Sequence, residues 1–141
     1  MTARRLQVVL LVDAAYSVAV GVLLLAGTWD GLWDALDLPQ GRPALFVQIG
    51  GALLWGIAYL QWLAARTPPL MVPVARASAL INALSAVVIV VWLIAGELDI
   101  GTLGTVLLIA AAAFSVAFTV LYLMASIRPG GYGPEPPAAP G

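Results

Sequence analysis

The residue with the clearest potential for chemistry in this sequence is Asp13, an acid that interrupts a long apolar run. A charged side chain at membrane depth costs about 2.5–3.5 kcal/mol even on lenient insertion scales, so it needs a partner or a function. Two interpretations follow. Asp13 either accepts hydrogen bonds that hold helices together, or it serves as a carboxylate that binds a ligand or carries a proton.

Polar residues that could act with Asp13 recur at helical spacing in the other apolar segments of the chain. Tyr16 shares a helix face with Asp13, whereas Tyr59, Asn82 and Tyr122 belong to three later segments. At 1.5 Å per residue, these groups lie roughly 10–12 Å from the same end of their helices. We therefore predict a polar core or ligand-binding cavity formed by these five residues, with Asn82 and Tyr122 as the preferred donors to Asp13.

The absence of two residue types restricts the chemistry further. The sequence contains no Cys and no His, which excludes disulfides, thiolate nucleophiles, Cys/His zinc sites and His general bases. No spacing of carboxylates resembles a metal site. We therefore expect no catalytic residues, no metal site and no cofactor, and a protein that is not an enzyme.

The overall composition is that of a membrane protein. Charged residues make up 9% of the 141 residues and hydrophobic residues 62%, and the mean hydropathy is +1.03. Such a chain has too few polar groups to cover its surface in water, so lipid must solvate most of it. The net charge of −1 argues against a nucleic-acid partner.

Four apolar runs are each long enough to cross a bilayer as a helix, which takes roughly 20 residues. They cover residues 6–26, 44–65, 73–95 and 102–126. Pro43 and Pro73 are expected in the first turns of the second and third helices, with no proline in a helix interior. The first run is expected to be retained, since it is too long for a signal-peptide core. The predicted fold is an all-α, up-down, four-helix membrane bundle in residues 1–128, followed by a Pro/Gly-rich tail, 129–141, that is disordered when free.

Arginine positions predict the orientation of the bundle. Five of the six basic residues flank helix ends on one side, and Arg42 alone lies on the other. They are Arg4, Arg5, Arg66, Arg76 and Arg128. Because short cytoplasmic loops carry an excess of Arg and Lys, both termini are predicted to be cytoplasmic.

The first external loop carries an amphipathic pattern. Trp29, Leu32, Trp33 and Leu36 recur at i, i+3, i+4 and i+7, which is typical of a short helix that lies in the membrane interface with tryptophans at headgroup depth. This helix is either a lid that anchors the first and second membrane helices or, through Trp29 and Trp33, a docking surface for a partner.

Several of these features together resemble the small four-helix DoxX-like membrane proteins of bacteria. They are the Asp-x-x-Tyr stretch at Asp13–Tyr16, the tryptophan-bearing external loop, and a second helix with Gly-Gly that ends in Tyr-Leu-x-x-x-Ala-Ala-Arg at Tyr59–Arg66. The resemblance covers most of residues 6–126 and implies a multi-pass protein of the bacterial cytoplasmic membrane. Some members of the group are associated with quinone or thiol oxidoreductases, but thiol chemistry does not carry over to a chain without Cys.

Three functional classes fit these features. The first is a non-enzymatic accessory or interaction subunit of a larger membrane complex, with other subunits or further copies of itself as partners. The second is a binder or carrier of a lipid, a quinone or another small molecule in a polar cavity in the cytoplasmic half of the bundle. The third is a small oligomeric channel or transporter. This class is favoured least, because the chain has a single intramembrane acid and no broken helix.

Overall fold

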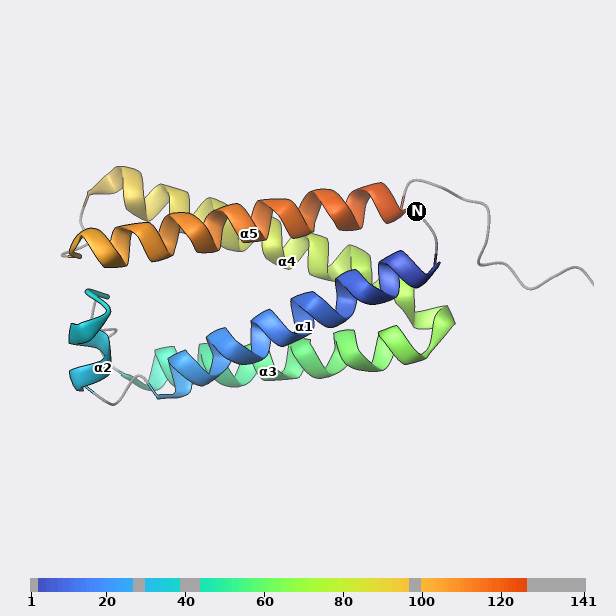
Figure 1. Ribbon diagram of the computed structural model, residues 1–141, viewed down its shortest axis with the longest axis horizontal. Coiled ribbons are helices and arrows are strands. Elements are labelled where there is room, and N and C mark those ends of the chain that lie inside the picture. Colours follow the sequence, from blue (N-terminus) through green and yellow to red (C-terminus); the bar gives the residue numbers. More distant parts are fainter. Residues whose placement is uncertain (1–2, 27–29, 39–43, 97–99, 127–141) are drawn as a thin grey trace, which may run out of the picture.

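The computed structural model describes residues 3–26, 30–38, 44–96 and 100–126, and every element within them is a helix (Figure 1). The helices are α1 (Ala3–Leu25), α2 (Asp30–Ala35), α3 (Ala44–Arg66), α4 (Pro68–Ala95) and α5 (Thr102–Ser126). The predicted all-α class is therefore confirmed. The tail, residues 129–141, and Trp29 lie outside the described residues.

Four of these helices, α1, α3, α4 and α5, are long and apolar enough to cross a membrane, and the chain is a multi-pass membrane protein. They run along the long axis of the molecule in alternating directions (Figure 1). The start of α1, the α3–α4 turn and the end of α5 lie at one end, which we call the Arg66 end. The short helix α2 lies at the opposite end, which we call the α2 end.

The third membrane helix begins earlier than the sequence pattern suggested. It starts at Pro68 instead of Pro73, and a single residue, Thr67, separates it from α3. Pro68 and Pro69 occupy the first turn, where a missing N–H costs nothing. Pro73 therefore lies inside the helix, and the prediction that no helix interior contains a proline is wrong. The hydrogen bond that Pro73 cannot make would reach the carbonyl of Pro69, in the first turn, so little of the helix is affected.

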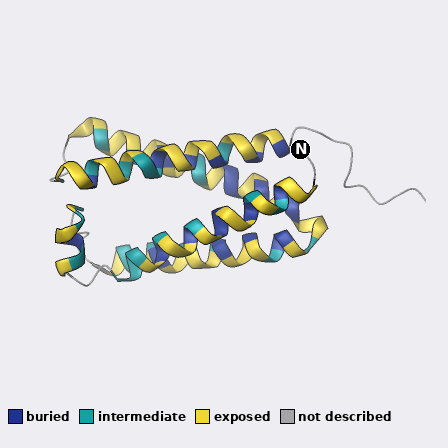
Figure 2. Ribbon diagram, in the orientation of Figure 1, coloured by how far each residue is buried: buried dark blue, intermediate teal, exposed yellow. Residues whose placement is uncertain are grey.

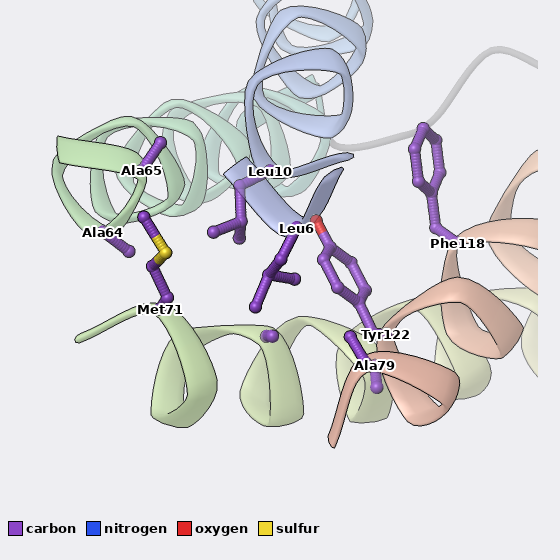
Figure 3. Packing of buried hydrophobic residues seen from close by; sticks show 10 residues of the cluster. Leu6, Leu10, Ala64, Ala65, Met71, Ala79, Phe118 and Tyr122 are labelled. Atoms are coloured by element: carbon purple, nitrogen blue, oxygen red, sulfur yellow. The ribbon is translucent and has the colours of Figure 1, made fainter. Parts of the chain in front are cut away.

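The membrane helices form two pairs that meet at the Arg66 end. α1 packs along α3, and α4 packs along α5; the pairs lie closest near the start of α1 (Figure 1). The buried apolar core is at this end (Figure 2), where Tyr122 of α5 points to the α1 side beside Leu6 (Figure 3). Its members are Leu6, Leu10, Ala64, Ala65, Met71, Ala75, Ala79, Phe118, Tyr122 and Ala125. Large apolar residues on the outer faces are exposed, as expected where lipid is the solvent.

Two glycines allow α1 and α3 to approach closely. A Cβ added to Gly51 would lie 2.8 Å from the carbonyl oxygen of Gly21 and 3.0 Å from the backbone nitrogen of Leu25. Backbone atoms cannot move aside as a flexible side chain can. Small residues at such crossings let membrane helices gain van der Waals contact. By contrast, a Cβ on Gly56 of the same helix would meet nothing within 4 Å.

The predicted short helix between the first two membrane helices is confirmed as α2, and its end is defined by a capping motif. The amide of Leu38 donates to the carbonyl of Trp33 (3.1 Å) and the amide of Asp37 donates to that of Asp34 (3.2 Å). Asp37 has a φ of 51°. This is the Schellman arrangement, in which a left-handed residue ends the helix. The Asp37 side chain and carbonyl pack against Gly101 and Gly104, so the end of α2 rests on the start of α5.

Trp33 was predicted to mark either a lid or a partner-docking surface. Its side chain is only 7% exposed, so it is packed inside the protein and is not available to a partner. The burial of Trp33 therefore favours the lid over the docking surface.

The crossing of α1 and α3 yields a first prediction. We expect Gly51→Ala to lower the free energy of unfolding by about 1–3 kcal/mol, because the added methyl group meets backbone that cannot retreat. Gly56→Ala is the matched control and should leave stability unchanged or raise it by up to about 1 kcal/mol, since alanine favours the helix. Unfolding of both variants in detergent micelles measures the difference, and equal stabilities would contradict the close crossing.

Candidate functional site

Asp13 lies at the centre of a buried polar cluster. One oxygen of its carboxylate, Oδ2, accepts a hydrogen bond from Gln61 Nε2 at 2.6 Å, from the Tyr122 hydroxyl at 2.8 Å and from Asn82 Nδ2 at 3.1 Å. Asp13 belongs to α1, and the three donors belong to α3, α4 and α5. A single oxygen atom therefore connects all four membrane helices.

The cluster extends to a hydroxyl group on α4. The side-chain nitrogen of Gln61 also donates to Ser78 Oγ at 3.1 Å, so both of its N–H groups are used. The side-chain oxygen of Gln61 is buried and accepts no hydrogen bond from the described residues. The amide thus works as a two-pronged donor that holds α3 to α1 and α4.

Most of these polar groups are buried. Asp13 and Gln61 are each 1% exposed, Ser78 is 2% exposed and Tyr122 is fully buried. The donors to Asp13 are all neutral, and within the described ranges no basic side chain is paired with it. The geometry fits helix fastening, in which a buried acceptor is satisfied by donors from its neighbours.

The structure brings together three of the five residues predicted for the site. Asp13, Asn82 and Tyr122 lie in the cluster, and the two donors expected first are among those found. Tyr16 lies beside it without a recorded hydrogen bond to Asp13, and its ring contacts the rings of Phe114 (5.5 Å between centroids) and Phe118 (6.2 Å).

Tyr59 was predicted to share this site and does not. Its side chain is 60% exposed and points away from the interior, with its ring stacked on Trp62 at a centroid distance of 6.0 Å. The face of α3 assigned to the interior was therefore the wrong one. Aromatic residues were taken as inward-facing, but lipid accommodates them on the outside equally well.

Gln61 is the site residue that the sequence reasoning missed. The spacing of small residues on α3 could have indicated that Gln61 faces inward. Gly51, Ala58 and Ala65 follow one another at intervals of seven, and all three are buried. Gln61 falls between Ala58 and Ala65 on the same face, as small residues and polar side chains do where membrane helices pack.

A second feature lies between α1 and α3. It is an apolar groove of about 460 Å³ that opens at the protein surface. We call it the α1–α3 groove. Its lining residues are Leu11, Ala14, Ala15, Val18, Trp55, Ala58, Tyr59 and Trp62. Small-molecule pockets typically measure ~300–1,000 Å³, so the groove is large enough to hold a ligand.

Three aromatic side chains line the α3 side of the groove, and each makes a contact that holds it in place. The indole nitrogen of Trp55 donates to the carbonyl oxygen of Val18 on α1 at 3.3 Å. This bond satisfies the donor of Trp55 and leaves its ring as an apolar wall. Tyr59 and Trp62 stack on each other one turn further along.

Arg66 stands at one end of this aromatic row. Its guanidinium carbon lies 4.0 Å from the centre of the Trp62 ring, in a cation–π contact. The Arg66 side chain is exposed. The groove thus has an apolar body with a positive charge at one end.

The cluster yields a second prediction. We expect Asp13→Leu to lower the free energy of unfolding by about 2 kcal/mol, because three donors lose their acceptor and interhelical hydrogen bonds in membranes average about 0.6 kcal/mol each. Asp13→Asn retains an acceptor oxygen and should cost no more than about 1 kcal/mol. Unfolding in detergent micelles measures both. If Asp13→Asn were as destabilising as Asp13→Leu, the negative charge itself would be required and the fastening role would be refuted.

Comparison of the chain with protein-family models, curated proteins and solved structures gave no match. The resemblance to DoxX-like proteins stays a prediction. The fold class and the geometry of the site rest on the residues and contacts described above.

Proposed function

We propose that this chain is a non-enzymatic membrane protein that binds an amphiphilic molecule, with the apolar chain of that molecule in the α1–α3 groove. The observation that carries the proposal is the α1–α3 groove. It is apolar, has a volume of about 460 Å³, and its row of aromatic residues ends at the exposed Arg66. The proposal moves the expected lipid or quinone site from the bundle interior to this surface.

The shape of the groove supports a chain-like ligand. Its floor consists of small residues of α1 and α3, including Ala14 and Ala58, and larger side chains such as Trp55 and Trp62 rise beside them. A linear acyl or isoprenoid chain fits between two helices over such a floor. An α-helix is about 10 Å across with its side chains, so a partner helix would rest on the aromatic residues and leave the floor uncovered.

The buried polar cluster also favours a ligand at the surface over one inside the bundle at the level of Asp13. The polar residues that could have formed an internal cavity bind one another instead, and Asp13 and Tyr122 are almost completely buried. An inner ligand would have to displace hydrogen bonds that join all four membrane helices. A ligand in the groove displaces none of them.

An accessory subunit of a larger membrane complex is the competing proposal, since a partner protein could also cover this surface. Blocking the groove separates the two. We expect Ala15→Trp to fill the groove and to reduce by at least tenfold the phospholipid retained by the purified protein in native mass spectrometry. The control is Ala117→Trp on the exposed face of α5, which should retain lipid as the unmodified protein does. Equal retention by the two variants, or a co-purifying protein in place of lipid, would overturn the proposal.

We further propose that the Arg66 end is cytoplasmic, as the positions of the basic residues indicate. The absence of Cys makes single-cysteine labelling a clean measurement. A membrane-impermeant maleimide should label Gly31→Cys on α2 in intact spheroplasts and Thr67→Cys only after permeabilisation. Thr67 makes no side-chain capping bond, so its replacement should not disturb the turn. The reverse pattern of labelling would invert the assignment.

A further inference from the structure

We infer that the ligand of the α1–α3 groove is an anionic phospholipid, with its head-group phosphate bound by Arg66. The inference rests on the proposed function and specifies its ligand. It draws on the orientation of Arg66, on the order of polar and apolar groups along α3, and on the charge that the arginine presents.

The contact with Trp62 orients the Arg66 guanidinium and leaves its donors available. The guanidinium carbon lies over the Trp62 ring, 4.0 Å from its centre, and the N–H donors of a guanidinium lie in the plane of that group. A phosphate binds to the edge of that plane through two parallel hydrogen bonds. Among the described residues no carboxylate is paired with Arg66, so this edge is free for an anion.

The order of charged and apolar residues along α3 matches the order of the charged head group and the apolar acyl chain in a phospholipid. Arg66 is the last residue of the helix, Trp62 lies one turn before it, and Trp55 lies about 10 Å deeper at 1.5 Å per residue. A lipid with its phosphate at Arg66 would therefore lay its acyl chain along Trp62, Tyr59 and Trp55. Tyrosine and tryptophan suit the boundary between the head group and the acyl chain, since each has an apolar ring and a polar tip.

Arg66 also has a structural explanation. A cation in the last turn of a helix interacts favourably with the carbonyl end of the helix dipole, and this would hold Arg66 in place without any ligand. The two explanations differ in what they predict for lipid selection. A capping charge affects stability alone, whereas a phosphate-binding arginine changes which head group is retained.

The size of the effect follows from the exposure of Arg66. An exposed arginine near a membrane surface contributes enough to favour an anionic over a zwitterionic lipid by about fivefold. Most of the binding then comes from the acyl chain in the groove. Free phosphate lacks that chain, so inorganic phosphate should not compete.

The test uses the full-length protein reconstituted into vesicles of equimolar phosphatidylglycerol and phosphatidylcholine, extracted into mild detergent and analysed by native mass spectrometry. We expect the unmodified protein to retain phosphatidylglycerol over phosphatidylcholine by about fivefold. Arg66→Gln should abolish the preference and leave the total lipid retained nearly unchanged. Arg76→Gln is the matched control, because Arg76 is exposed near the same end of the bundle but belongs to α4, which contributes no residue to the groove, whereas Arg66 contacts the groove residue Trp62.

Each other outcome has a distinct meaning. Equal loss of preference in Arg66→Gln and Arg76→Gln would show a general surface attraction and overturn the inference. Lipid retained by the unmodified protein without preference would also overturn it and leave the proposed function standing. If the unmodified protein retained no lipid, both would fail. Competition by millimolar inorganic phosphate would indicate a simple anion site and contradict the lipid assignment.

Discussion

The structure depends on one carboxylate oxygen. Asp13 Oδ2 accepts hydrogen bonds from Gln61, Asn82 and Tyr122, and these side chains come from the three other membrane helices. Association of helices in lipid gains nothing from the hydrophobic effect, because the lipid is as apolar as the side chains it would release. Directional hydrogen bonds and close packing must then set the arrangement. The polar cluster supplies the hydrogen bonds at the Arg66 end. The crossing of α1 and α3 at Gly21 and Gly51 supplies the close packing.

The helices α1 and α3, which carry Asp13 and Gln61, also form the proposed binding surface. Asp13 and Gln61 face inward, whereas their neighbours Ala14 and Ala58 form part of the groove floor. The hydrogen bond between Asp13 and Gln61 sets the relative position of α1 and α3 at this level, and so sets the width of the groove. A buried polar cluster can thus determine the shape of a neighbouring apolar site, as residues behind a binding surface often do.

The polar cluster and the α1–α3 groove thus have separate roles: the cluster holds the helices together, and the groove is the proposed binding surface. The sequence contains neither Cys nor His, and its buried acid accepts hydrogen bonds from neutral donors that hold the helices in position. What faces lipid is an aromatic wall with an arginine at one end, a combination that suits the border between hydrocarbon and head groups. The proposed lipid would lie at that border, and the hydrogen bonds of the polar cluster would maintain the shape of the α1–α3 groove.

The helical class, the four spans, the short helix α2 and the inward position of Asp13 with Asn82 and Tyr122 as donors could all be predicted from the sequence. These follow from run length, from helical spacing and from the cost of an unpaired acid in lipid. The three-dimensional arrangement was needed to show that Gln61 and not Tyr59 completes the cluster, that α4 begins at Pro68, and that α1 and α3 form a groove. The reason is that a membrane helix is apolar on every side, so periodicity alone does not show which face its neighbours cover.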